Sequence, residues 1–294
     1  MWTEIAQQIS QATGQSFEIC DRTSLSGGCI NQAYRISNGP NAPNRQSYFL
    51  KLNSAGAEAM FTAEALGLKQ MAAANAIRVP RPICQGSTSS NSFIVLEDLD
   101  LSGRGGSESW AEMGRQLARL HRLAISSQGF GWERNNTIGD TPQINDWTQS
   151  WAAFWTEHRI GYQLKLAARR GGRFEQGERL LEAVPALLDG HEPEPSLVHG
   201  DLWSGNAAVT KDGEPVIFDP AVYYGDREVD LAMTELFGRF PAAFYQAYEA
   251  TWPLAPGYSQ RKPLYNLYHI LNHFNLFGGG YGSQAQQMIK QLLG

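Results

Sequence analysis

Three polar residues that could do chemistry surround one turn signal. Asp201 is followed five residues later by Asn206, and Asp219 comes further along the chain. Between Asn206 and Asp219, two short apolar runs flank the pair Asp212-Gly213, a strong sequence signal for a β-hairpin. A turn centred on that pair places Asn206 opposite Asp219, with Cβ atoms about 5 Å apart. An amide oxygen and a carboxylate so placed are hard oxygen ligands, suited to Mg²⁺ that carries a nucleotide's phosphates.

The spacing of Asp201 and Asn206 adds a second group to this site. Asp-x-x-x-x-Asn is the spacing of a kinase catalytic loop, in which the aspartate accepts the proton of the acceptor hydroxyl and the asparagine holds metal. The stretch therefore predicts a phosphoryl-transfer site. Two other interpretations stay open here. An Asp near an Asn often only caps or turns the chain, and His199-x-Asp201 could be the metal pair of a hydrolase.

A glycine pair near the amino terminus could bind the phosphates. Residues 25–34 indicate a strand, a tight glycine turn and a second strand. Adjacent glycines let backbone N–H groups approach a phosphate closely. Ser26 and the amides from Gly27 and Gly28 to Asn31 are therefore the expected phosphate contacts, although paired glycines on their own usually indicate only a turn.

The cysteines give two further expectations. Cys29 lies in the glycine turn, where converging N–H dipoles lower a thiol's pKa and favour oxidation, so it is a candidate redox-sensitive residue. A small space-filling role is the alternative. Cys20, Cys29 and Cys84 cannot all pair and show no metal-ligand spacing, which predicts a reducing cytoplasm.

Lys51 and Glu64 are charged residues in apolar surroundings. Lys51 lies in the predicted strand 48–52, where a lysine is costly unless it is paired or reaches water. The helix predicted over residues 57–74 has one apolar face, formed by Met60, Phe61, Leu68 and Met71. Glu64 falls on that face and needs a cationic partner. Lys51 and Glu64 are therefore predicted to form the pair that holds α- and β-phosphates in kinases, with two independent surface residues as the alternative.

The chain is predicted to divide near residue 100. Five strands and one main helix precede this point and mostly helices follow it, which is an uneven α+β pattern. The polar, glycine-rich stretch 102–107 is typical of a flexible connector between lobes. The expected units are residues 1–100, which bind the nucleotide, and 101–294, which carry the catalytic and substrate-binding groups. Backbone groups from Glu97 to Leu99 are expected to contact adenine.

In the second unit, helices are predicted over residues 110–123, 174–189, 228–250 and 264–277. Asp230 is expected to brace the backbone of the catalytic loop rather than to contact substrate. Aromatic residues at helical spacing usually form core, although tryptophans this close together could line a sugar pocket. The residues concerned are Trp147, Trp151, Phe154 and Trp155.

Composition and charge exclude other classes. A net charge of −5 over 294 residues argues against nucleic acid as a partner, because phosphate backbones recruit a basic face. The basic cluster 169–173 is expected to be a solvated turn between helices. No apolar run approaches about 18 residues and the amino terminus does not resemble a signal peptide, so no membrane partner is expected.

The strings around these residues closely resemble the fructosamine kinases, or ketosamine-3-kinases, within the clan of aminoglycoside and choline kinases. The resemblance runs nearly end to end, through residues 27–31, 48–51, 136–139, 199–206, 218–225 and 227–233. Asp226 departs from the pattern, since a histidine is expected there. The resemblance implies a two-lobed, protein-kinase-like α+β fold. Its N-terminal lobe is a small antiparallel sheet with one main helix, and its C-terminal lobe is larger and mostly helical.

The resemblance also implies an activity: ATP- and Mg²⁺-dependent phosphorylation of the 3-hydroxyl of a ketosamine, the adduct of a sugar with an amine. The substrate is expected free or on protein lysines, and the phosphorylated adduct decomposes and frees the amine, a deglycation. Asp201 is then the base, and Asn206 and Asp219 are the Mg²⁺ ligands. Lys51, held by Glu64, steadies the phosphates.

Trp203, beside the base, is the candidate to stack on the sugar. The next interpretation is a kinase for another small-molecule hydroxyl, of the aminoglycoside or choline type. A nucleotide-binding pseudokinase is less favoured, because all five residues of the expected machinery are present. The oligomeric state is not predicted.

Overall fold

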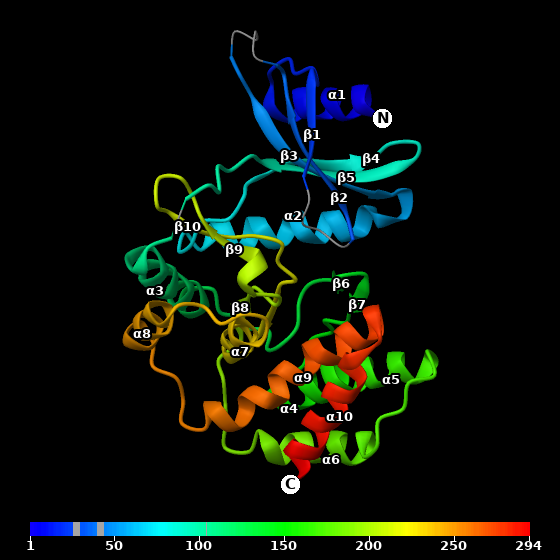
Figure 1. Ribbon diagram of the computed structural model, residues 1–294, viewed down its shortest axis with the longest axis vertical. Helices are drawn as coiled ribbons and strands as arrows, with labels where there is room; N and C mark the ends of the chain where they lie inside the picture. Colours follow the sequence, from blue (N-terminus) through cyan, green and yellow to red (C-terminus); the bar gives the residue numbers. More distant parts are fainter. Residues whose placement is uncertain (26–29, 40–43, 104) are drawn as a thin grey trace.

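A five-stranded antiparallel sheet and its two helices form one end of the molecule, and a larger helical body forms the other (Figure 1). The structure is a computed structural model that describes residues 1–25, 30–39, 44–103 and 105–294. The predicted α+β architecture, with a small sheet lobe and a larger, mostly helical lobe, is confirmed.

The sheet lobe has the strand order β1-β2-β3-β5-β4, with every neighbouring pair antiparallel. Its elements are α1 (Trp2–Thr13), β1 (Asp21–Leu25), β2 (Gln32–Ser37), β3 (Ser47–Ser54), α2 (Glu58–Ala73), β4 (Pro82–Ser87) and β5 (Asn91–Glu97). Successive side chains of a strand point to opposite faces of a sheet. Leu50 and Leu52 accordingly pack in the cluster that includes α1, whereas Ile94 packs in the cluster that includes α2.

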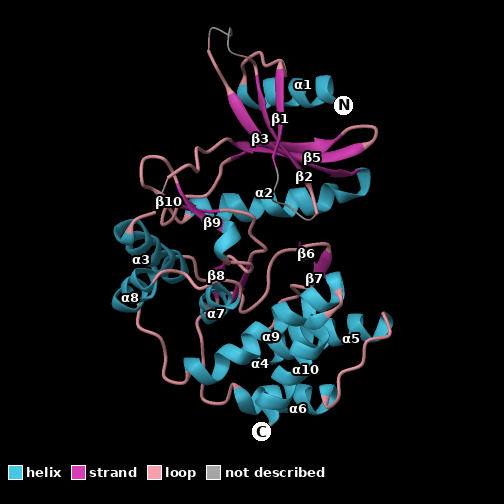
Figure 2. Cartoon of the chain, viewed as in Figure 1, coloured by secondary structure: helices cyan, strands magenta, loops and turns pink. Residues whose placement is uncertain are grey.

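In the helical part of the chain, the described residues also form three short two-stranded pairs, and the segments that connect these strands carry the residues of interest (Figure 2). The first elements of the helical lobe are α3 (Ser107–Leu123), β6 (Asn136–Ile138), β7 (Thr141–Gln143), α4 (Trp151–Phe154), a π-helical segment (Trp155–Gly161), α5 (Tyr162–Arg169) and α6 (Gly177–Leu187). The remaining elements are β8 (Ser196–Val198), β9 (Ala207–Val209), β10 (Pro215–Ile217), β11 (Tyr223–Gly225), α7 (Glu228–Leu236), α8 (Ala242–Thr251), α9 (Tyr258–Phe277) and α10 (Gly280–Leu293).

One predicted helix is wrong in its extent. Residues 228–250 form two helices, because α7 ends at Leu236 and α8 begins at Ala242. Gly238 lies between them at φ 95°, in the left-handed region, and Pro241 precedes α8. A left-handed residue and a proline both interrupt the helical hydrogen-bond pattern.

The aromatic residues after the predicted loop are core. Trp151, Phe154 and Trp155 are each at most 4% exposed, and Trp151 stacks on Phe154 with ring centroids 5.7 Å apart. The interpretation as core is therefore confirmed for these three residues, which do not line a sugar pocket. Trp147 is only half-buried, and its ring stacks on Tyr224 with centroids 6.0 Å apart. The basic cluster 169–173 lies between α5 and α6 and is mostly exposed, as predicted.

The connector between the lobes packs against the β9–β10 hairpin. A Cβ added at Gly103 would lie 2.0 Å from the Thr210 carbonyl oxygen, so only glycine fits this close approach. The N–H of Lys211 donates to the Asp100 carbonyl at 2.9 Å. The proposed boundary near residue 100 falls in this connector, between the end of β5 and the start of α3.

Across the described ranges, no helix combines the length and the apolar character that crossing a membrane requires. Cys20 and Cys84 are free thiols.

Candidate active site

The β9–β10 hairpin turns over three residues rather than two. The N–H of Thr210 donates to the Glu214 carbonyl at 2.8 Å, which closes a turn of residues 211–213, and the pairing of β9 with β10 continues in that register. Gly213 has φ 88°, the left-handed conformation that three-residue hairpins require. The Asp-Gly signal located the hairpin correctly, but it does not distinguish these two turn lengths.

Asn206 consequently faces Phe218, whose N–H donates to the Asn206 carbonyl at 3.0 Å. The prediction that Asn206 and Asp219 are directly opposed is wrong by one residue. Asp219 adopts φ 58°, a left-handed conformation that aspartate tolerates better than most residues. Its Oδ1 lies 2.7 Å from Lys51 Nζ, so the side chain reaches the sheet lobe.

Lys51 Nζ forms two ion pairs, with Glu64 and Asp219, each at 2.7 Å. The predicted Lys51–Glu64 pair is confirmed. Lys51 is only 5% exposed, and it lies between Leu50 and Leu52, whose side chains occupy the opposite face of β3. Burial by itself lowers the pKa of Lys51, but the charges of Asp219 and Glu64 outweigh it and raise the pKa above its usual value. The lysine therefore stays charged.

Asp201 is tied to Asn206 at the base of the hairpin. Asn206 Nδ2 donates to the Asp201 carbonyl at 2.8 Å and to Asp201 Oδ2 at 3.2 Å. Burial and the charges of Asp219 and Asp230 raise the pKa of Asp201 to about 7, against the lowering effect of the hydrogen bond from Asn206. A carboxyl group that titrates near neutral pH is suited to accepting a proton from a hydroxyl.

Asp230 braces the catalytic loop, as predicted. It accepts hydrogen bonds from the N–H of His199 at 2.7 Å and of Gly200 at 2.9 Å. His121 Nε2 donates to it at 3.1 Å, and His121 Nδ1 accepts from the Tyr248 hydroxyl at 2.8 Å. Burial opposes ionisation, yet these hydrogen bonds and the nearby histidines hold the pKa of Asp230 below its usual value.

His199 uses both ring nitrogens within the loop. Nε2 donates to the Phe218 carbonyl at 2.9 Å, and Nδ1 accepts from the Asp201 N–H at 3.3 Å. Burial lowers the pKa of His199, so the ring is neutral. With both nitrogens engaged, His199 offers no lone pair to a metal ion, which disfavours the interpretation of His199-x-Asp201 as the metal pair of a hydrolase.

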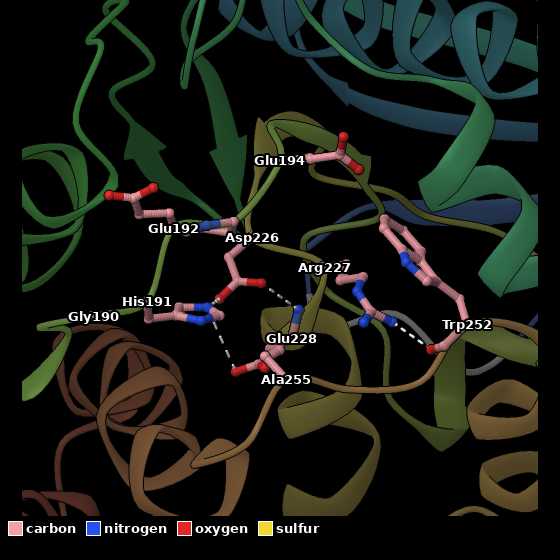
Figure 3. Close-up of a pocket in the computed structure, with 10 residues that line it drawn as sticks. Gly190, His191, Glu192, Glu194, Asp226, Arg227, Glu228, Trp252 and Ala255 are labelled. Atoms are coloured by element: carbon pink, nitrogen blue, oxygen red, sulfur yellow. Dashed lines mark hydrogen bonds and ion pairs between the residues drawn. The ribbon is translucent and has the colours of Figure 1, made fainter.

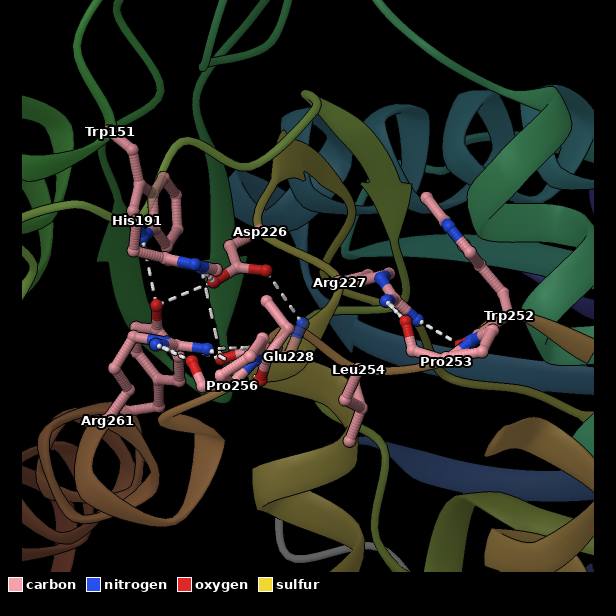
Figure 4. A network of polar contacts seen from close by, with 12 residues as sticks. Trp151, His191, Asp226, Arg227, Glu228, Trp252, Pro253, Leu254, Pro256 and Arg261 are labelled. Atoms are coloured by element: carbon pink, nitrogen blue, oxygen red, sulfur yellow. Dashed lines mark hydrogen bonds and ion pairs between the residues drawn. The ribbon is translucent and has the colours of Figure 1, made fainter. Parts of the chain in front are cut away.

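A buried polar network holds the start of α7, the helix that carries the bracing carboxylate (Figure 3). Asp226 accepts from His191 Nε2 at 2.7 Å, from the Tyr265 hydroxyl at 2.6 Å and from the Glu228 N–H at 3.0 Å. Glu228 accepts two bonds from Arg261, at 2.7 and 2.8 Å (Figure 4). Asp226, which stands where a histidine was expected, thus accepts a hydrogen bond from a histidine in the loop between α6 and β8.

The same network borders a cavity of about 380 Å³ that includes none of the predicted site residues. The ligand atoms of His191, Asp226 and Glu228 lie within 4.8 Å of one another. Their carboxylates are already paired with Arg261 and His191, so the network satisfies its own charges and holds α7 in place.

The side-chain oxygen atoms of Asn206 and Asp219 are suitable ligands for Mg²⁺. Because Asp201 engages the Asn206 amide nitrogen, the amide oxygen is left free, and no donor reaches it from the residues that the structure describes. Asp219 uses one carboxylate oxygen for Lys51 and is 44% exposed, so its other oxygen remains open to a ligand. Amide and carboxylate oxygens are the ligands that Mg²⁺ prefers.

Part of the predicted phosphate-binding turn lies outside the described residues, namely Ser26, Gly27, Gly28 and Cys29. Asn31 is described, and its Oδ1 accepts from Asn53 Nδ2 at 2.8 Å. The side chain of Asn31 is therefore used within the sheet lobe.

Glu97 and Leu99 lie at the end of β5 and in the connector. The N–H of Glu97 donates to the Arg81 carbonyl at 2.9 Å, and the Glu97 carboxylate pairs with Arg78 at 2.6 Å. Neither group is therefore available to bind adenine. Leu99 differs, because within the described chain no backbone hydrogen bond involves it.

Two residues to which the sequence had assigned no role position the segment after Asp219. Asn136 Nδ2 donates to the Val222 carbonyl at 2.9 Å, and Gln143 Nε2 donates to the Ala221 carbonyl at 3.0 Å. Both side chains are buried. Asn136 stands in one of the strings that carry the family resemblance, which was the only signal in the sequence.

The comparison with protein families fits this arrangement. The family model described as fructosamine kinase matches residues 1–294, the whole chain. The chain belongs to this family. The predicted resemblance is thereby confirmed, and the protein is a kinase, a phosphotransferase with a hydroxyl acceptor.

Similar proteins and structures agree with membership of the family. A probable ketoamine kinase of Synechocystis sp. is 62% identical over 292 residues, which cover 99% of this chain and 97% of that protein. The chloroplastic protein-ribulosamine 3-kinase of Arabidopsis thaliana is 44% identical over 286 residues, covering 95% and 85%. The crystal structure of a provisionally assigned fructosamine-3-kinase from Haemophilus somnus superposes with a TM-score of 0.92 at 34% identity, covering 100% and 98%.

The fold extends beyond the family. The streptomycin–ATP complex of an aminoglycoside phosphotransferase has a TM-score of 0.63 at 11% identity, over 100% of this chain and 96% of that one. This likeness concerns the fold alone and confirms that the fructosamine kinase family shares its architecture with aminoglycoside phosphotransferases.

Proposed function

We propose that the protein transfers the γ-phosphoryl group of ATP to the 3-hydroxyl of a ketosamine. The observation that carries this proposal is the contact between the lobes. Lys51 of the sheet lobe lies 2.7 Å from Asp219 of the helical lobe, whose charge acts on Asp201. Membership of the fructosamine kinase family supports the ketosamine as acceptor.

Asp201 is the proposed base. It would accept the hydrogen bond of the 3-hydroxyl, orient that oxygen toward the γ-phosphorus and take its proton as the new oxygen–phosphorus bond forms. The bond between the γ-phosphorus and the bridging oxygen breaks in the same step, and ADP leaves with that oxygen. The hydrogen bond from Asn206 and the bracing of the loop by Asp230 fix its position. Most of the rate gain in phosphoryl transfer comes from such positioning and from neutralisation of charge.

Asn206 and Asp219 would hold Mg²⁺, which supplies positive charge to the phosphate oxygens when bound. Lys51 has three N–H donors, of which Glu64 and Asp219 accept two. The third donor is available to an α- or β-phosphate oxygen. Glu64 is therefore a positioning residue, since it holds the ammonium group in place.

The remaining proposed contacts follow the connector and the glycine turn. The backbone groups of Leu99 make no hydrogen bond to the described residues and could meet the edge of adenine, and Glu97 positions the connector through its bonds to Arg78 and Arg81. Ser26 and the amides from Gly27 to Asn31 remain the proposed phosphate contacts. Residues 1–100 and 101–294 remain the proposed nucleotide-binding and catalytic units, and we place the activity in the reducing cytoplasm.

Trp203 is the proposed platform for the sugar, because it follows the base by two residues and is 36% exposed. Ketosamines are favoured over aminoglycosides or choline by the relatives' names, ketoamine kinase and protein-ribulosamine 3-kinase. The phosphorylated adduct would then decompose and release the amine, so the activity would remove sugar from amines.

A panel of acceptors tests this function. The purified protein is incubated with ATP and Mg²⁺ and with fructosyl-lysine, ribulosyl-lysine, kanamycin or choline, while ADP release is followed. We expect turnover with a ketosamine and a phosphomonoester at the 3-position by phosphorus NMR. Turnover with kanamycin or choline alone would contradict the proposal, and ATP binding without any turnover would indicate a pseudokinase.

A further inference from the structure

Exposed aromatic side chains gather next to the catalytic loop. Few large hydrophobic side chains are exposed in the part of the chain that the structure describes: Leu101, Leu123, Ile125, Trp203 and Phe277. Trp203 belongs to the catalytic loop, and Phe277, at the end of α9, is 56% exposed. A series of contacts through Ser204, Phe237 and His273 leads from one position to the other.

Trp203 is held in place by the backbone beside it. A Cβ added at Gly205 would lie 2.3 Å from indole Cζ2 and 2.4 Å from Cη2. The six-membered ring therefore packs closely over Gly205, and this contact restricts its movement before any ligand arrives. A ligand that stacks on a fixed ring loses less conformational entropy on binding.

A row of rings leads from the catalytic loop to α10. Ser204 Oγ donates to the Phe237 carbonyl at 3.1 Å, which joins the loop to the end of α7. The Phe237 ring lies 4.6 Å from the His273 ring, which in turn lies 5.7 Å from Phe277 and 5.1 Å from Tyr281. We call these four residues, Phe237, His273, Phe277 and Tyr281, the aromatic strip. Phe277 is exposed and the other three are half-buried.

The carboxyl end of α9, which carries Phe277, lies near the β6–β7 turn. A Cβ added at Gly139, in the turn between β6 and β7, would lie 3.0 Å from Leu276 of α9 and 3.1 Å from Ile30. Figure 1 shows the β6–β7 turn between the sheet lobe and the carboxyl end of α9. Because the Phe237 carbonyl accepts a hydrogen bond from Ser204, the strip begins beside the loop that carries Asp201, and it runs from there to the carboxyl end of α9.

The strip carries no positive charge that would repel a cation. His273 Nδ1 donates to the His269 carbonyl at 2.8 Å, and burial lowers the pKa of His273 despite this bond. The amine of a ketosamine is a secondary alkyl amine and is protonated at neutral pH. Aromatic rings attract such an ammonium group through cation–π interactions.

We propose that the aromatic strip binds the amine side of the acceptor, and that its occupant is the side chain and adjoining backbone of a glycated lysine residue. The inference rests on the proposed function. Trp203 is the proposed platform for the sugar. The four rings of the aromatic strip are then available to the ammonium group and to the carbon chain that follows it. A small amine would leave the outer rings, Phe277 and Tyr281, uncovered.

Two acceptors with the same sugar and the same ammonium group test this proposal. One is the fructose adduct of methylamine, and the other is the fructose adduct of the side chain of Nα-acetyl-lysine methylamide. In Phe277→Ala, the KM for the lysine acceptor should rise about tenfold, while the KM for the methylamine adduct, the KM for ATP and kcat stay within about twofold. Tyr281→Ala should behave alike, and Phe277→Trp should keep the wild-type KM.

Leu123→Ala is the matched control, because Leu123 is a similarly exposed apolar residue on α3. It should leave both KM values unchanged. If Phe277→Ala changed the KM for both acceptors equally, or changed neither, the proposed role of the strip would be overturned. The proposed function would still stand, because the wild-type protein would turn over both acceptors. A wild-type protein that phosphorylates neither adduct would overturn the proposed function and this proposal together.

Discussion

Lys51 Nζ lies 2.7 Å from Asp219 Oδ1, although 168 residues separate the two along the chain. One residue belongs to the sheet lobe and the other follows the hairpin of the helical lobe, so the contact joins the lobes at the proposed phosphate site. Glu64 lies on the other side of the same ammonium group, also at 2.7 Å. The three charges form a unit that can be tested separately for stability and for activity.

Lys51→Met should destabilise the fold and abolish turnover. Glu64 would keep a carboxylate with little access to water and no cation, which typically costs about 3–5 kcal/mol in the free energy of unfolding. The double variant Lys51→Met/Glu64→Gln should recover most of that loss, because it removes the stranded charge, but it should remain inactive. Urea denaturation and the ADP-release assay measure the two effects.

The control for Lys51→Met is Lys290→Met, which removes a pair with Glu175 that is mostly exposed, at 3.4 Å. Exposed pairs contribute only about 0–1 kcal/mol. If Lys51→Met were no more destabilising than Lys290→Met, the buried triad would have no structural role.

Gly200→Ala should disturb the catalytic loop. Gly200 has φ 80°, and an added Cβ would lie 2.2 Å from the Ala221 carbonyl oxygen. Gly190→Ala is the control, since Gly190 has φ 70° but open space around its Cβ position. Both substitutions incur the left-handed backbone penalty of about 1–2 kcal/mol.

Only Gly200→Ala should also lower kcat, because only there must the loop move away from Ala221. Steady-state kinetics at saturating ATP compare the two variants. Equal kcat values for the two would show that the close approach at Gly200 does not set the geometry of the loop.

His269 should make the protein less stable in acid. Its side chain is 3% exposed, and its Nδ1 has no hydrogen-bond partner among the described residues. Burial and the neighbouring His273 lower the pKa of His269 to about 3, against the charge of Asp230. The pKa in the unfolded chain is about 6.5, so below that pH the unfolded state binds a proton that the folded state does not. Stability is therefore present above about pH 6.5 and falls as the pH drops toward 3.

At pH 5 the loss from His269 is about 2 kcal/mol. His269→Leu removes the titration and leaves no polar atom to satisfy. The difference in unfolding free energy between pH 7.5 and pH 5 should accordingly be about 2 kcal/mol smaller in His269→Leu than in the wild type. Parallel pH curves for the two proteins would mean that His269 binds a proton in the folded state.

The sequence was sufficient where a residue contradicted its surroundings. Lys51 in an apolar strand and Glu64 on an apolar helix face each needed a partner, and the two are 2.7 Å apart. The bracing role expected of Asp230 is also confirmed, since it holds the loop through two backbone N–H groups.

The sequence was insufficient where one backbone angle decides the outcome. The Asp-Gly pair is compatible with two turn lengths, and the longer one shifts Asn206 opposite Phe218. The left-handed conformation of Asp219, which takes its side chain to Lys51, has no local sequence signal. Arg159 was also missed. Arg159 is fully buried, and its guanidinium Cζ lies 4.0 Å from the centroid of the Tyr223 ring. The two residues are far apart in the sequence, so no periodicity reveals this contact.

The central claim is that Asp201 takes the proton of the acceptor hydroxyl at a site that Lys51, Asn206 and Asp219 complete. Asp201→Asn keeps the shape of the side chain but removes the base, so the most direct measurement is its kcat with fructosyl-lysine beside its Kd for ATP. We predict that kcat falls about 10²–10⁴-fold, while the Kd for ATP and the melting temperature stay nearly unchanged. A kcat close to that of the wild type in a folded, ATP-binding Asp201→Asn protein would contradict the account.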